Sequence, residues 1–257
     1  MAFLYMPILV LIVLSFNQNK SRGAWTGFTF DWYRKLFTNR LILGAFVNTM
    51  IVALVSSVAA TLIGTAAALG IHTMNKWMKK AVRMLTYIPI MSPEIIMGVS
   101  LMLLFVFVRT ELGVPLELGL LTLILSHITF NIPYVIFNVL PKLRQMDSYA
   151  YDAALDLGCN PWQAFYKVIL PEIMPGITAG FLMAVTYSLD DFVISYFTAG
   201  PTSQTLPLAI WGQLRRRVSP EMNALSTIIF VVVLVLLLVS NLSSMRRERR
   251  GRKAVRL

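Results

Sequence analysis

Six apolar stretches divide the chain, and polar or turn-rich segments separate them. The stretches cover residues 2–16, 42–71, 84–108, 119–140, 173–199 and 223–243. A helix needs about 20 apolar residues to cross a hydrocarbon core of about 30 Å, and five of the stretches reach that length. The pattern therefore predicts an all-α, polytopic membrane protein with six transmembrane helices.

The first stretch is the shortest of the six. As a helix, residues 2–16 would rise about 22 Å. A secretory signal peptide is the alternative interpretation, but no basic residue precedes the stretch and residues 15–18 offer no small-x-small cleavage site. We therefore expect a transmembrane helix that a further upstream turn would complete.

Two of the stretches are interrupted. Pro89 and Pro93 break the third near its start, and Ser92 is a good N-cap for a new helix with Pro93 in its first turn. Asp190 and Asp191 interrupt the fifth. Broken helices are therefore expected at both places.

A long segment that contains polar residues, 147–171, separates the fourth and fifth stretches. It is predicted to form two short helices, because Gly158 can end the first in the left-handed conformation and Asn160 can cap the second. Pro171 is expected to stop the second helix. A pair of alanines gives the first helix a small surface, which suits docking into a groove of another protein.

Seven residues of this segment have a notable spacing: Asp152, Ala153, Ala154, Gly158, Ile169, Leu170 and Pro171. The spacing resembles the EAA loop of ABC-importer permeases, which couples a permease to its ATPase. Asp152 departs from the Glu with which that motif usually opens. The resemblance implies a type I ABC-importer permease architecture. One transmembrane permease domain would cover residues 1–257, with a cytoplasmic coupling loop at 141–172 and a basic cytoplasmic tail at 244–257.

Composition supports the membrane class, since 57% of the residues are apolar and 14% are charged. The net charge of +11 could indicate nucleic-acid binding, but seven of the 23 basic residues lie between Arg246 and Arg256, directly after the last apolar stretch. Basic residues gather at the cytoplasmic ends of membrane helices. We therefore predict contact with membrane lipid and none with nucleic acid.

The basic residues also predict an orientation in the membrane. Segments 73–83, 141–172 and 244–257 carry fourteen of them, whereas segments 17–40, 109–118 and 200–222 carry nine. The richer side is predicted to be cytoplasmic, which places both termini in the cytoplasm. The three arginines at 215–217 count against this orientation.

The chain offers no sequence pattern for catalysis or for a bound cofactor. Cys159 is its one cysteine, and neither His72 nor His127 has a second ligand at zinc spacing. The phosphate-binding motif GxxxxGK[ST] does not occur. We therefore predict a transport subunit rather than an enzyme, with no catalytic residue, metal site or cofactor of its own.

Three acids fall within apolar stretches, and three aromatic side chains lie close to two of them along the chain. A charged Asp at the centre of a membrane helix costs about 3 kcal/mol, so these acids should face protein or water. Aromatic faces hold alkylammonium groups by cation–π attraction. Six residues are therefore predicted to line a substrate pathway: Glu94, Tyr187, Asp190, Asp191, Phe192 and Tyr196.

Structural interpretations of the same acids stay open. Glu94 could simply complement a helix dipole. Asp190 and Asp191 could cap a broken helix or form pairs across a subunit interface.

Six further segments narrow the assignment. They are Met91-Ser-Pro-Glu-Ile95, Leu125-Ser-His-Ile-Thr-Phe130, Ser188-Leu-Asp-Asp191, Gly200-Pro201, Leu206-Pro-Leu208 and residues 218–225. Together they resemble spermidine/putrescine importer permeases of the PotC type. The resemblance implies a bacterial inner-membrane subunit that moves polyamines and pairs with a second permease. It also implies two ATPase subunits, which would hold ATP and Mg, and an extracytoplasmic polyamine-binding protein.

Two other classes of transporter remain as alternatives. An ABC-importer permease could carry an anion or a chelated metal, although acids along the pathway would repel anions. A secondary transporter or channel could use the same acids as proton or cation sites, but the sequence contains no convincing internal repeat to support that class.

Overall fold

The computed structural model describes residues 2–19, 25–147, 149–214, 221–228, 230–231 and 234–235. Within these residues the chain is almost entirely helical, and the pairing between Asn17 and Phe28 is an isolated β-bridge. The all-α prediction is therefore confirmed for the described part. The chain divides into two compact units, one from Met1–Asn48 with Gln204–Leu257 and the other from Thr49–Ser203.

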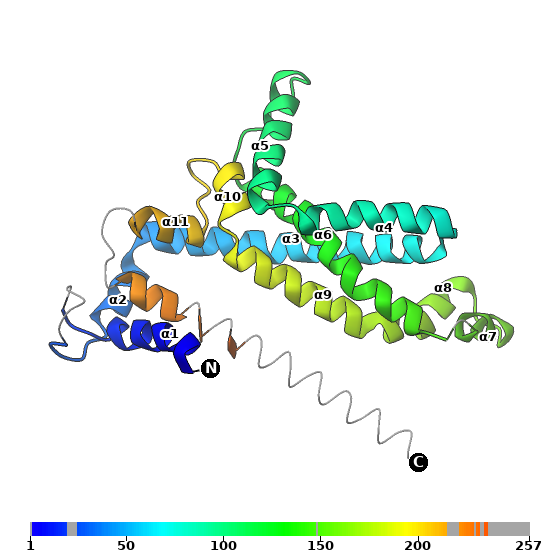
Figure 1. The fold of residues 1–257 in the computed structure, drawn as a ribbon, viewed down its shortest axis with the longest axis horizontal. Helices are drawn as coiled ribbons and strands as arrows, with labels where there is room; N and C mark the ends of the chain where they lie inside the picture. Colours follow the sequence, from blue (N-terminus) through cyan, green and yellow to red (C-terminus); the bar gives the residue numbers. More distant parts are fainter. Residues whose placement is uncertain are drawn as a thin grey trace, which may run out of the picture. The chain divides into compact units, whose positions relative to one another are not determined.

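The helices follow one another closely along the chain (Figure 1). They are α1 (Ala2–Ser15), α2 (Asp31–Thr38), α3 (Arg40–Thr73), α4 (Lys76–Met91), α5 (Glu94–Thr110), α6 (Leu120–Gln145), α7 (Ala150–Asp156), α8 (Pro161–Ala164), the π-helical turn η1 (Phe165–Ile169), α9 (Leu170–Asp190), α10 (Val193–Thr198) and α11 (Leu206–Leu214). A helical segment also covers residues 221–228.

Three helices in the described part are long and apolar enough to cross a membrane: α3, α6 and the continuous helix Pro161–Asp190. The pair α4 and α5 would make a fourth span, although the two helices meet at 103°. Helix α1 is apolar but shorter. Most of residues 223–243 and the whole tail 244–257 lie outside the described residues. The multi-span character is thus confirmed, while the count of six stays a prediction.

The break between α4 and α5 lies where the sequence predicted one, but its local chemistry differs. Ser92 ends α4, and its Oγ donates a hydrogen bond of 2.8 Å to the carbonyl oxygen of Ile88. Pro93 takes the N-cap position of α5. The prediction of Ser92 as N-cap was wrong, because its hydroxyl donates to a carbonyl group of the preceding helix. Pro89 lies inside α4 and does not break it.

In the unit Thr49–Ser203, α6 and α9 run side by side (Figure 1). Glycines allow the close approach: a Cβ added at Gly176 would lie 2.8 Å from the carbonyl oxygen of Asn138, and one at Gly180 would lie 3.1 Å from Cα of Val135. On the other side of α6, a Cβ at Gly64 of α3 would lie 2.7 Å from Cβ of Val135. Small residues drive helix association in lipid, where burial of apolar surface gives little gain.

Val135 therefore lies at the centre of a three-helix contact. The buried core around it contains Ala68, Ile71, Val135, Ile136, Val139, Leu140, Leu143, Ile173 and Ala184. In the other unit, a separate core consists of Leu36, Ile42, Ala45, Leu206, Met222 and Leu225.

We predict that Gly176→Val destabilises the protein by about 1–3 kcal/mol, because the added side chain must displace the α6 backbone. Thermal unfolding of the purified protein in detergent measures the effect. Gly70→Val is the matched control, since a Cβ at Gly70 of α3 would meet nothing within 4 Å. Equal unfolding temperatures for the two variants would contradict the packing role of Gly176.

Candidate functional site

The segment 147–171 forms the turn that its sequence predicts. Gly158 follows α7 with φ of +87°, a conformation that side chains with a Cβ rarely adopt. Asn160 then caps α8: its Oδ1 accepts from the backbone N–H of Gln163 at 2.8 Å. The Oε1 of Gln163 accepts in return from the N–H of Asn160 at 3.1 Å. Pro161 occupies the first position of the helix.

The prediction that Pro171 stops the second helix was wrong. Helix α8 continues through η1 into α9, so one helix runs over Pro161–Asp190. The N–H of Leu170 donates to the carbonyl of Phe165, five residues earlier. This wider turn lies immediately before Pro171, which has no N–H and sits in the first turn of α9, where a proline is tolerated.

The predicted coupling residues are only partly on the surface of this chain. Asp152, Ala153 and Gly158 are exposed, whereas Ala154 is buried. A Cβ at Gly158 would meet nothing within 4 Å, so this glycine is needed for its backbone conformation and not to make room for another part of this chain. Ile169 and Leu170 are half-buried, and Pro171 is exposed.

Sequence reasoning missed a set of large exposed side chains in the same segment. Leu157 is 87% exposed and Trp162 is 74% exposed, and Tyr149 and Tyr166 are exposed as well. Several large apolar side chains exposed within one short segment indicate a partner. The signal was present in the sequence as bulky residues directly beside the Gly158 turn.

At the other end of α9, the side chain of Asp191 holds the break before α10. Its Oδ1 accepts from the N–H of Ile194 at 3.1 Å, and its Oδ2 accepts from the N–H of Ser195 at 2.7 Å. The side chain is only 4% exposed. His127 of α6 places Nε2 3.5 Å from the Oδ2 atom of Asp191 and 3.2 Å from Oγ of Ser195. The geometry of Asp191 is thus that of a cap on a broken helix.

A buried polar layer continues from this cap toward α3. Asn131, one turn after His127 on α6, donates from Nδ2 to Oγ of Ser188 at 2.8 Å. The Oγ of Ser188 lies 3.3 Å from Oγ of Ser56 on α3. Buried hydrogen bonds between helices add to close packing in a membrane protein. Polar residues four apart in an apolar helix were the available sequence signal.

The remaining predicted pathway residues lie nearer the surface of the chain. Asp190 and Glu94 are exposed, and so are Tyr187 and Tyr196. The ring of Phe192 lies 5.7 Å from that of Tyr196, centroid to centroid. The structure therefore separates the two neighbouring aspartates: Asp191 faces the protein interior, and Asp190 does not. Roles in a pathway stay predictions for all six residues.

Within the part of the chain that the structure describes, no group of three or more His, Cys, Asp or Glu residues could hold a metal ion.

Comparison with known proteins gives concordant matches. The family model described as "Binding-protein-dependent transport system inner membrane component" matches residues 60–252. The chain is 39% identical over 241 residues to the spermidine/putrescine transport system permease protein PotC of Escherichia coli K12, covering 94% of this chain and 89% of PotC. It is 37% identical over 232 residues to the putrescine transport system permease protein PotI of the same strain, covering 90% of this chain and 83% of PotI.

A solved structure supports the fold independently. A bacterial ABC transporter involved in the import of the acidic polysaccharide alginate matches with a TM-score of 0.73, over 95% of this chain and 90% of that chain. The sequence identity is 22%, so this likeness shows the fold and nothing of the cargo.

We predict that Asp191→Ala lowers the free energy of unfolding by about 2 kcal/mol, because two buried N–H groups lose their acceptor. Thermal unfolding in detergent measures the loss. Asp190→Ala is the matched control, since this side chain caps no helix; it should change the free energy of unfolding by less than about 0.5 kcal/mol. Equal losses in the two variants would contradict the capping role of Asp191.

Proposed function

We propose that the chain is the permease subunit of an ATP-driven ABC importer for polyamines. It belongs to the family of binding-protein-dependent transport system inner membrane components. Spermidine and putrescine are the proposed cargo. The observation that carries the proposal is the similarity, along nearly the whole chain, to permeases named for spermidine and putrescine transport.

The chemistry of the exposed acid is consistent with this cargo. A polyamine carries several ammonium groups, and their transfer into a low-dielectric pore without compensation is very costly. Asp190 ends a membrane helix and remains exposed on this chain, where its carboxylate can replace part of the lost hydration. Because the fold is shared with an importer of an acidic polysaccharide, the cargo must be chosen by such side chains and not by the fold.

The proposed complex contains a second permease, two ATPase subunits with ATP and Mg, and an extracytoplasmic binding protein. The family description names dependence on a binding protein. The segment 147–171 is the proposed contact with an ATPase, and its exposed Leu157 and Trp162 give that contact an apolar centre. Such exposed side chains are typical anchors of a protein interface.

Coupling follows from the continuity of the helix Pro161–Asp190. When ATPase closure displaces the 147–171 segment, the displacement passes along this continuous helix. Asp190 is at its far end. The α6–α9 contact makes the two helices move together, and alternating access results from rocking of the permease halves.

The proposed location is the bacterial inner membrane, with the 147–171 segment and both termini in the cytoplasm. The ATP-hydrolysing partners require the coupling segment to be on that side. The excess of basic residues in segments 73–83, 141–172 and 244–257 supports the same orientation.

We predict that Ala153→Asp abolishes transport, because a charge in the docking surface would be desolvated against the ATPase. Gly158→Val should have the same effect, because Val is strained at positive φ. Uptake and substrate-stimulated ATP hydrolysis of the purified complex are measured. Ala153→Ser, which keeps the residue small, is the control. Normal hydrolysis and a retained ATPase in the Asp and Val variants would refute the docking role.

We predict that Asp190→Asn strongly reduces uptake of labelled spermidine while the complex still assembles. The substitution keeps the size of the side chain and removes its charge, so the loss reports electrostatics. Asp190→Glu, which restores the carboxylate, should recover much of the uptake. Parental uptake by the Asn variant would exclude an electrostatic role of this acid in the pathway.

A further inference from the structure

Three aromatic rings from α6 and α9 form a cluster next to the Asp190 end of α9. The centroids of Tyr134 and Tyr187 are 4.6 Å apart. The ring of Phe130, which is buried, lies 5.2 Å from that of Tyr134 and 6.2 Å from that of Tyr187, centroid to centroid, in T-shaped arrangements. Tyr187 is 37% exposed, so the cluster is open on one side of the chain.

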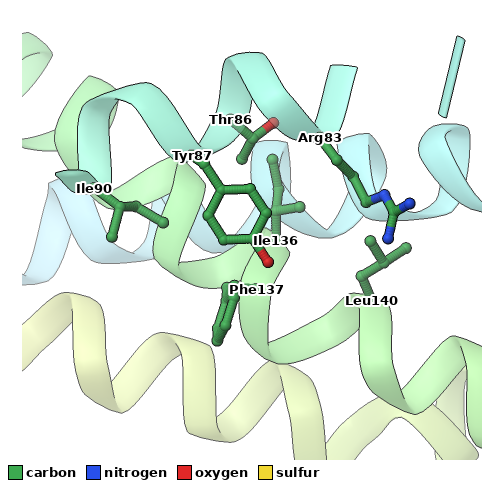
Figure 2. A pocket seen from close by; sticks show the side chains of 7 residues that line it. All are labelled: Arg83, Thr86, Tyr87, Ile90, Ile136, Phe137 and Leu140. Atoms are coloured by element: carbon green, nitrogen blue, oxygen red, sulfur yellow. The ribbon is translucent and has the colours of Figure 1, made fainter. Parts of the chain in front are cut away.

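A second aromatic pair continues the arrangement toward α4. Tyr87 of α4 and Phe137 of α6 have centroids 5.8 Å apart in an edge-to-face arrangement. Figure 2 shows these two rings next to each other in a pocket that Ile90, Ile136 and Leu140 also line. Both rings are partly open, with Tyr87 43% and Phe137 54% exposed.

The two groups of rings lie on one face of α6. Phe130, Tyr134 and Phe137 are spaced four and three residues apart, which places them on the same side of the helix. Seven residues correspond to a rise of about 10 Å along the axis. We call Phe130, Tyr134, Phe137, Tyr87 and Tyr187 together the aromatic row.

Negative charge lies along the aromatic row. Asp190 follows Tyr187 by three residues, and so shares its side of α9. At the other end, Arg83 lines the same pocket as Tyr87 (Figure 2), and its positive charge limits how far a cation can follow the row.

We propose that the aromatic row is a binding site for a linear alkylammonium ion that spans its two groups of rings. The ring faces would hold the ammonium groups by cation–π attraction, and their apolar surface would cover the methylene chain. Each ring would bind an ammonium group weakly, and several rings follow one another along the row. Several weak contacts suit conduction better than one site that encloses the cation tightly. The proposal deepens the polyamine function proposed above and rests on it.

The spacing of the rings gives the site a preference for length. A triamine such as spermidine is long enough to place one ammonium group against each group of rings, at the partly exposed Tyr187 and Phe137. The shorter diamine putrescine reaches one group of rings at a time. Loss of the Tyr87–Phe137 pair should therefore weaken binding of the triamine more than binding of the diamine.

The experiment uses the complete importer, reconstituted in liposomes, with labelled spermidine and labelled putrescine. The variants are Tyr87→Leu and Phe137→Leu, which remove a ring and keep an apolar side chain. Tyr87→Phe and Phe137→Tyr are the matched controls, because they keep the ring. We expect each Leu variant to raise KM for spermidine about tenfold. The rise for putrescine should be smaller, and the ring-retaining variants should stay near the parental KM.

Two outcomes would overturn the proposal. One is a parental KM for both polyamines in the Leu variants, while Asp190→Asn strongly reduces uptake. The other is loss of the second permease from the purified complex in the Leu variants but not in the ring-retaining ones, which would assign the rings to a subunit interface. If the parental complex transports neither polyamine, the proposed function itself fails, and this result is seen before any variant is tested.

Discussion

The carboxylate of Asp191 accepts two backbone N–H groups where α9 ends and α10 begins. In an apolar environment, a helix break is possible only if the freed backbone groups find partners within the protein. Because Asp191 supplies both acceptors and packs against His127, its side chain must face inward. Its neighbour Asp190 then falls on a different side of the helix, since successive residues diverge by about 100°. One buried cap thus determines which of two adjacent acids stays accessible.

Close helix packing makes this arrangement rigid. Gly176 and Gly180 bring α9 against α6, and Gly64 brings α3 against the same stretch of α6. The polar layer of Ser56, Asn131 and Ser188 crosses these contacts. Since α8, η1 and α9 are one helix over Pro161–Asp190, the last part of the 147–171 segment and the Asp191 cap lie at opposite ends of that helix. A displacement of one end of this helix would therefore be transmitted to the other end.

The sequence predicted features that depend on local chemistry. The left-handed Gly158, the Asn160 cap and the break near Pro93 each follow from one or two residues and their neighbours, and all three are present. The errors arose where neighbouring elements compete. The hydroxyl of Ser92 bonds backward to α4 rather than forward to α5, and the wider turn of η1 carries the helix past Pro171. The different environments of Asp190 and Asp191, and the aromatic row, depend on contacts between α6, α9 and α4 that periodicity along one chain does not contain.

The fold is shared with an importer of an acidic polysaccharide, so the fold itself does not determine the charge of the cargo. Side chains on the shared helices must therefore distinguish an anionic cargo from a cationic one. The described chain offers two kinds of side chain for a polycation, exposed carboxylates and partly open rings. Carboxylates alone would hold a polyamine too tightly for release, because several ion pairs in a low-dielectric site add up. Rings alone would give too little compensation for the lost hydration of each ammonium group. A proposed site that combines the rings of α6 and α9 with the carboxylate of Asp190 would spread the attraction over the length of the cargo.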